Sequence, residues 1–236
     1  MPTRTEVRSS HLRAFRLPGS RVALVPDQAV LLAGDRVQVS VRVAAGESLE
    51  VVEPGGTVAY AMRGAQAAWD VRIEVEDGGH LAWDGRPFVV ADGADVRRRL
   101  ELDVARTAAV SLRETLVLGR TGEAPGLLHS ATRVRREGRP VLVEDLDSRA
   151  GLGPHRVVDQ VLHLGLACPE HGDHTIALES GDVVHRWLGA ATHASPLRGV
   201  CQSSARPEYA TTPRLSERTT SRADSRSSLS PAASAT

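Results

Sequence analysis

Residues 36–52 decide the fold class, reading Arg-Val-Gln-Val-Ser-Val-Arg-Val-Ala-Ala-Gly-Glu-Ser-Leu-Glu-Val-Val. In residues 36–43 valine alternates with polar or charged residues, a period of two that is typical of a strand with one buried face. Gly46 supplies a turn residue, and a second apolar run follows at residues 48–52. The stretch therefore predicts a strand, a tight turn and another strand.

This unit recurs along the chain, 32 residues later and again 29 residues further on. One unit is too small to bury its own apolar face, so similar units must stack. The repeat predicts an all-β dominated, β-helix-like architecture of stacked strand-turn-strand units. The matching positions are Val41, Val43, Gly46, Leu49 and Val51; then Ile73, Val75, Gly78, Leu81 and Trp83; then Leu102, Val104, Thr107, Val110 and Leu112; and, in a partial fourth copy, Gly138, Val141 and Val143.

Two later segments carry apolar residues at positions i, i+1, i+4 and i+5, which fits a short amphipathic helix. The sequence thus predicts one or two short helices, although both segments are also short enough to be strands. The positions are Val157, Val158, Val161 and Leu162 in the first segment and Val183, Val184, Trp187 and Leu188 in the second.

Composition divides the chain into three parts. Residues 1–20 are polar and irregular, and we expect a poorly ordered arm there. Residues 21–196 contain the repeat and form the β domain. Of the last 36 residues, 14 are Ser or Thr, and large apolar residues almost vanish after Val200. Such a segment buries too little to fold alone, so residues 197–236 are expected to form a disordered tail.

Charge and cysteine content exclude several classes of protein. The 29 basic and 29 acidic residues cancel, so no global field steers the chain to nucleic acid or to a membrane. Two cysteines are too few for a disulfide framework. There is no signal-peptide pattern and no run near the roughly 20 apolar residues of a membrane helix. We expect a cytoplasmic protein with neither a nucleic-acid nor a membrane partner.

Catalytic signatures are missing. The sequence has no G-x-S-x-G, P-loop, G-x-G-x-x-G after a strand, H-E-x-x-H or C-x-x-C motif. This absence argues mildly against an enzyme.

Charged residues nevertheless interrupt apolar runs. Arg113 and Glu114 lie inside the run at residues 110–118, where an unpaired charge costs several kcal/mol. Such charges must be paired, hydrated or functional. Asp35 and Glu144 also lie at or within strand-like runs, where carboxylates line a wet passage or act as acid and base. Turn capping or ion pairing with arginine is the structural alternative for each.

A possible metal-binding loop reads Ala-Cys-Pro-Glu-His-Gly-Asp-His at residues 167–174. The thiolate of Cys168 and the imidazoles of His171 and His174 could converge there on a borderline metal such as Ni²⁺ or Zn²⁺. A polar surface loop is the alternative.

Five stretches, taken in order between about Arg21 and Ser195, resemble a known family. They are Leu-Ala-Gly-Asp-Arg-Val at 32–37; Pro-Gly-Gly-Thr-Val-Ala-Tyr at 54–60; residues 83–95 with Pro87 and Asp92-Gly93-Ala94; Glu114 with Leu118-Gly119-Arg120 and Gly122-Glu123; and Gly138-Arg139-Pro140 with Val143-Glu144. In order and spacing they resemble the UreD (also called UreH) type of urease accessory protein, in its short actinobacterial-like form.

The resemblance implies a non-catalytic scaffold that joins an F-type accessory protein and a G-type GTPase to deliver nickel to apo-urease. It implies no permanent cofactor, only Ni²⁺ in transit through water-filled passages lined in part by carboxylates. Asp35, Glu114 and Glu144 are the acidic residues within matching motifs, and Arg120 matches the Leu-Gly-Arg arginine. These four are the candidates for nickel passage or partner contact. Oxygen ligands hold Ni²⁺ less tightly than imidazole or thiolate, which suits a handover.

Two alternatives remain at this level. A β-solenoid polysaccharide lyase or hydrolase could use the same carboxylates, but would need an aromatic-lined groove, and aromatics are only 3% of the chain. A plain β interaction module without a metal role is the other.

Overall fold

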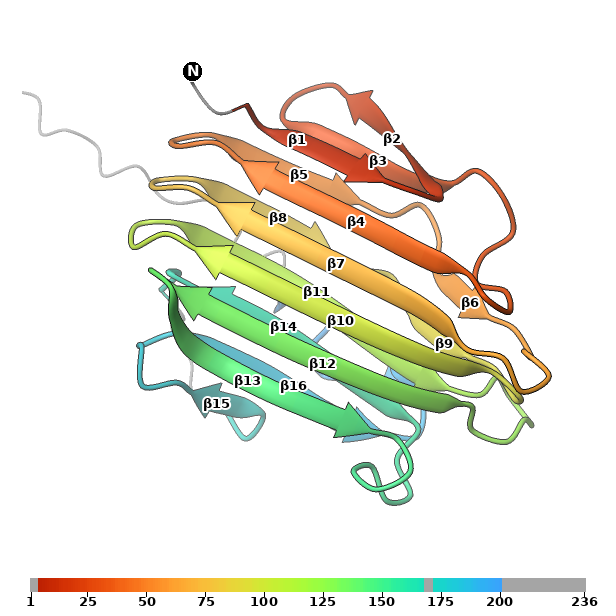
Figure 1. Ribbon diagram of the computed structural model, residues 1–236. Helices are drawn as coiled ribbons and strands as arrows, with labels where there is room; N and C mark the ends of the chain where they lie inside the picture. The colour runs from red at the N-terminus through yellow and green to blue at the C-terminus, as the bar shows by residue number, and fades with distance from the viewer. Residues whose placement is uncertain (1–3, 168–171, 201–236) are drawn as a thin grey trace, which may run out of the picture.

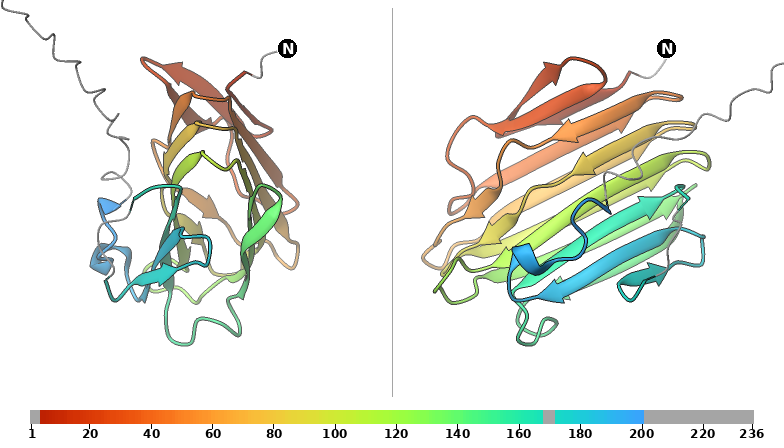
Figure 2. Two further views of the ribbon diagram at one scale, coloured as in Figure 1. Left: turned by 90° about the vertical axis from the view of Figure 1, so that its left-hand side faces the viewer. Right: turned by 180° about the vertical axis from the view of Figure 1, so that it is seen from behind.

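The computed structural model describes residues 4–167 and 172–200 of the chain. Two β-sheets face each other along the molecule (Figures 1 and 2). The strands are β1 (Glu6–Ser9), β2 (Leu12–Leu17), β3 (Arg21–Pro26), β4 (Arg36–Val43), β5 (Ser48–Val52), β6 (Thr57–Ala59), β7 (Ala67–Val75), β8 (His80–Asp84), β9 (Phe88–Val90), β10 (Asp95–Val104), β11 (Ala109–Leu118), β12 (Leu127–Arg136), β13 (Arg139–Asp147), β14 (Val157–Leu164), β15 (Thr175–Ala177) and β16 (Val183–Gly189).

The chain winds between the two sheets as a β-solenoid of about 4 turns, which confirms the predicted fold class. Sheet A has six strands in the order β1-β4-β7-β10-β12-β13, and sheet B has the path β15-β16-β14-β11-β8-β5-β3-β2. Strands β4, β7, β10 and β12 run parallel in sheet A, while β5, β8 and β11 run parallel in sheet B. Each crossing between the sheets completes about half a turn of the solenoid.

The sequence repeat corresponds to the register in which strands of successive turns pair. In sheet A, Val41 lies opposite Ile73, which lies opposite Leu102. In sheet B, the second half of the unit aligns in the same way: Leu49 lies opposite Leu81, and Leu81 lies opposite Val110. Residues that match along the sequence are therefore direct neighbours in successive turns.

The prediction of a fourth copy of the repeat is only half correct. β12 stacks on β10, but Glu137 and Gly138 both have positive φ, 51° and 75°. Two left-handed residues in succession suit a tight hairpin turn. The chain therefore folds back as β13, antiparallel to β12 in the same sheet, instead of crossing to sheet B. Val141 and Val143 belong to this hairpin.

The predicted short amphipathic helices are wrong. Residues 157–164 and 183–189 are strands β14 and β16, and Thr192–Ala194 form a short 3₁₀ turn. Every residue of β14 is buried, because one face meets the core and the other is also covered. Burial on both faces produces adjacent apolar pairs, which also fit a helical spacing.

A single large core fills the space between the sheets, with a small satellite around Val161 and Leu197. Valine and leucine dominate it, and Trp69 and Phe88 meet edge to face with ring centroids 5.3 Å apart. Close stacking of turns also constrains backbone positions. A Cβ at Gly85 would lie 2.4 Å from the carbonyl oxygen of Arg113, so only glycine fits there.

The ends of the chain depart from the expected division into parts. The stretch expected to be a poorly ordered arm contains β1 and β2, which pair with β4 and β3. At the other boundary, Leu197 is buried against Val161. The remainder of the predicted tail, residues 201–236, lies outside the described residues. No helix in the described ranges is long and apolar enough to cross a membrane.

The stacked core predicts a large cost for truncating Leu102, which is fully buried in the central column of sheet A. Leu102→Ala should lower the free energy of unfolding by about 2–5 kcal/mol, measured by urea denaturation, because it leaves a cavity that close packing cannot refill. The matched control is Leu127→Ala on β12, whose side chain is exposed. Similar costs for both variants would contradict the assigned register.

Candidate functional site

The candidate site is built around the buried carboxylate of Glu114. It lies on the core face of β11 with only 8% of its surface exposed. Arg98 Nη2 of β10 lies 2.9 Å from Glu114 Oε1, and Gln160 Nε2 of β14 donates to Glu114 Oε2 at 3.0 Å. The charge embedded in the apolar run is thus paired across the sheets.

The contacts continue toward the far end of the solenoid. Gln160 Oε1 accepts hydrogen bonds from Arg186 Nη2 at 2.7 Å and Nε at 3.2 Å. Arg186, on β16, in turn forms a two-pronged ion pair with Glu144 of β13, whose Oε2 lies 2.7 Å from Nη2. The five residues Arg98, Glu114, Gln160, Arg186 and Glu144 form one connected series, called here the polar chain. It joins sheet A to sheet B twice.

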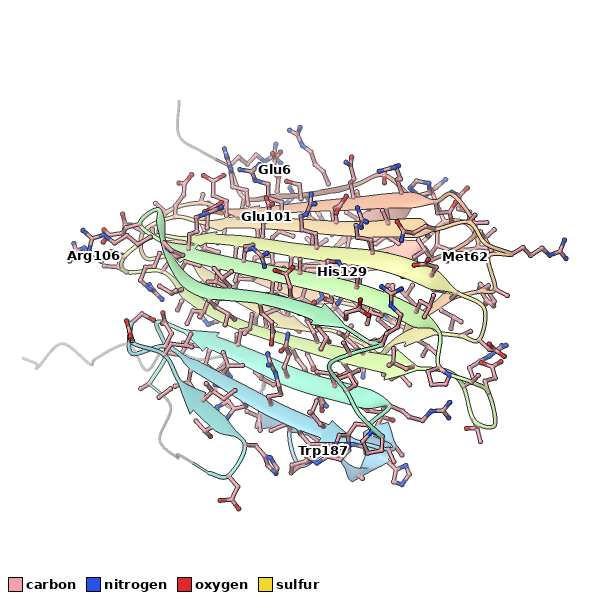
Figure 3. The ribbon with its side chains drawn as sticks, turned by 60° about the horizontal axis from the view of Figure 1, so that its bottom comes forward. Glu6, Met62, Glu101, Arg106, His129 and Trp187 are labelled. Atoms are coloured by element: carbon pink, nitrogen blue, oxygen red, sulfur yellow. The ribbon has the colours of Figure 1, made fainter. Side chains whose placement is uncertain are left out.

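Two cavities border the polar chain. The first, about 40 Å³, is lined by Arg98 and Glu114 together with Glu53 and aromatic side chains. The second, about 180 Å³, is lined by Glu144, Gln160 and Arg186. The hydrogen bond between Gln160 and Glu114 therefore lies at the boundary between the two. Figure 3 views the end of the solenoid from below, where β12 and β13 face β14 and β16, with His129 and Trp187 labelled.

Glu53 and Arg98 are two of the ionisable side chains that line the first cavity. Burial raises the pKa of Glu53, while hydrogen bonds from the Arg86 backbone N–H at 3.0 Å and from Trp83 Nε1 at 2.8 Å act in the opposite direction. The guanidinium of Arg98 lies 4.8 Å above the ring of Phe88, a favourable cation–π distance. Both charged side chains are held in fixed positions.

A second polar cluster occupies the outer face of sheet B. Asp159 of β14 is completely buried and accepts two hydrogen bonds from Arg113, at 2.8 and 3.0 Å. Thr115 and Ser195 also donate to it. Arg113 and Glu114 therefore point to opposite faces of β11, and each has its own partner.

Asp35 and Arg120 lie apart from the polar chain and line neither cavity. Asp35 caps a turn, because its Oδ2 accepts a hydrogen bond from the Leu32 backbone N–H at 2.7 Å. Arg120 lies in an exposed loop and pairs with Glu123. That contact is the main cause of the low pKa of Glu123, about 2.

The possible metal-binding loop stays a prediction, because Cys168 and His171 lie outside the described residues. His174 is exposed, and its carbonyl oxygen accepts from the Arg186 backbone N–H at 2.7 Å. Within residues 4–167 and 172–200, no three or more His, Cys, Asp or Glu side chains are grouped to hold a metal ion.

Sequence reasoning did not single out Arg98, Gln160 or Arg186. The alternation of inward and outward residues along a strand could have identified each as an inward-pointing side chain. Arg98 shares the parity of Val96 and Leu100, which places it on the buried face of β10. For Gln160 and Arg186 the same signal was hidden, because their segments were expected to be helical.

These features define a class of protein: a two-sheet β-solenoid with a buried ion pair between its sheets. A family model described as UreD urease accessory protein matches residues 12–211. The chain belongs to this family of non-catalytic accessory proteins.

Individual relatives agree with the family match. The chain is 47% identical over 157 residues to urease accessory protein UreD 1 of Streptomyces griseus, covering 63% of this chain and 62% of that protein, just under two thirds of its length. It is 34% identical over 224 residues to urease accessory protein UreD 2 of Saccharopolyspora erythraea, covering 84% of this chain and 78% of that protein.

The alternative of a polysaccharide lyase or hydrolase is therefore wrong. The aromatic residues agree, since Trp69 and Trp83 are buried in the core and do not line an open groove.

A pH effect follows from His163 on β14. Burial, with a smaller contribution from the edge-to-face ring of His185, lowers its pKa to about 4. The unfolded chain protonates this histidine near pH 6.5, so unfolding takes up a proton between pH 6.5 and 4. The stabilising contribution, about 3 kcal/mol, is complete above pH 6.5 and is lost as the pH falls toward 4.

Urea denaturation at pH 7.0 and 4.5 tests this effect. His163→Gln should lose less stability than the wild type over this range, whereas His193→Gln, at an exposed histidine, should behave as the wild type does. Identical losses in wild type and His163→Gln would contradict it.

Proposed function

We propose that this protein is a non-catalytic scaffold for the insertion of nickel into apo-urease. In this proposal it works in the cytoplasm in a complex with an F-type accessory protein and a G-type GTPase. Ni²⁺ is cargo in transit and not a resident cofactor. Membership of the UreD family supports the coarse role in urease maturation. The finer role rests on the interior of the solenoid.

The observation that supports it is the polar chain between the two cavities. An apolar core gains nothing from an internal series of five charged or amide side chains, since removing charges from water costs several kcal/mol per ion. Glu114 borders one cavity and Glu144 the other, and Gln160 contacts both Glu114 and Arg186. A hydrated cation that moves between the cavities would meet carboxylate and amide oxygens in sequence.

The arginines in this series suit transit better than storage. Arg98 neutralises Glu114, and Arg186 neutralises Glu144. An entering Ni²⁺ ion must displace a guanidinium group from its carboxylate, and that displacement offsets part of the metal's binding energy. Oxygen ligands are also the weaker ligands for Ni²⁺. The cargo would be held briefly and passed on.

Asp35 and Arg120 fit the other half of the proposal, contact with partners. Both lie in loops at the surface, where Asp35 orders a turn and Arg120 presents a guanidinium whose side chain is 56% exposed. Arginine is enriched where proteins meet.

Substitution of the carboxylates tests the passage. Glu114→Ala or Glu144→Ala should reduce nickel loading of apo-urease by about tenfold, because each removes a carboxylate that the passing Ni²⁺ ion would meet. Assembly of the complex should change little. Loading is measured as nickel per urease active site, and assembly by co-purification of the accessory proteins.

The matched control is Glu74→Ala, which removes a half-buried carboxylate, paired with Arg42, from the outer face of sheet A. Nickel loading equal to wild type in both core variants would rule out a lining role for these residues. Urease activity that is the same with and without this protein, given apo-urease and the other accessory proteins, would overturn the scaffold function itself.

A further inference from the structure

The N-terminal end of the solenoid is open. Sheet A ends there at β1 and sheet B at β2, the strands drawn at the top of Figure 1. A groove of about 360 Å³ lies between them, lined mostly by charged and hydroxyl side chains. The core residues Val22 and Leu49 also line it.

The outer edge of β2 differs from the other strand edges of the described chain. β1, β6 and β15 have only three or four residues. β13 is longer, but it carries Pro140, a register shift opposite Val134 and Arg135, and inward-pointing Glu144. Proline, bulges and inward charges protect an edge from further pairing. β2 pairs with β3 over six residues in unbroken register and contains no proline.

Side chains of β2 favour an acidic strand over a second copy of the chain. Phe15 is 49% exposed, and Arg13 and Arg16 are exposed on either side of it. β2 carries two arginines and no acidic residue, so pairing with a second copy would place positive charge on both strands, which is destabilising. Arg4 and Arg16 line the groove and form no ion pair within the described residues, whereas Glu47 is the one lining carboxylate in the same state.

We propose that the edge of β2 and the adjoining groove form a docking site for an extended segment of a partner protein. The segment adds as a strand to sheet B, with an acidic residue facing Arg16 on one face of the sheet and an apolar residue facing Phe15 on the other. Strand addition gains affinity from main-chain hydrogen bonds and specificity from alternate side chains. The inference is independent of nickel transit, because β2 lines neither cavity of the polar chain.

Binding of a model strand to the full-length protein tests the docking site. The probe is a fluorescein-labelled nine-residue peptide of alternating glutamate and valine, followed by fluorescence anisotropy. Arg16→Glu and Phe15→Ser should each weaken binding by about tenfold or more, because a charge-assisted contact or an apolar contact is lost. The matched control, Arg99→Glu, changes an exposed arginine on the central strand β10 and should bind as the wild type does.

Two measurements on the wild type keep the test independent of variant folding. Lysine in place of glutamate, or proline at the peptide's centre, should abolish binding, and the glutamate peptide should slow amide hydrogen exchange in residues 12–17. Equal affinity for the lysine peptide, unchanged affinity in Arg16→Glu, or protection confined to another part of the chain would each overturn the proposal.

Discussion

In-register stacking of successive turns is the constraint on which the rest of the structure depends. Because Val41, Ile73 and Leu102 lie opposite one another, each turn buries the apolar face that the turn before it leaves open. The same alignment fixes which side chains point inward at every level. A polar residue at an inward position therefore cannot escape to solvent and must find partners inside, as Arg98 and Glu114 do.

The polar chain ends at Glu144 and Arg186, on the last strands of the stack, where the regular repeat stops. The hairpin at Glu137–Gly138 keeps β13 in sheet A, and β14 then enters sheet B antiparallel to β11. The last strands are therefore not repeats of the earlier ones, and their inward residues differ in kind. Glu144 and Arg186 meet across the sheets at this end. This second ion pair of the polar chain therefore lies where the regular repeat stops.

Much of the fold was predictable from the sequence, because spacing alone reveals stacking when each turn has nearly constant length. Less of the candidate site was predictable. Glu114 was visible as a charge in an apolar run, yet its partner Gln160 lies 46 residues away on a segment whose buried pairs imitate a helix. Asp35, equally acidic and also within a family-like motif, caps a turn. Glu114 and Asp35 differ in their tertiary contacts, and the local sequence pattern does not encode those contacts.

The central claim is that the polar chain carries nickel, and the most direct measurement is an anomalous difference map. Crystals of the protein with its accessory partners, grown with Ni²⁺ and measured at the nickel absorption edge, would locate the ion. The account predicts density between the sheets, beside the oxygens of Glu144, Gln160 or Glu114. Density only near residues 168–174, or bound nickel with none between the sheets, would contradict it.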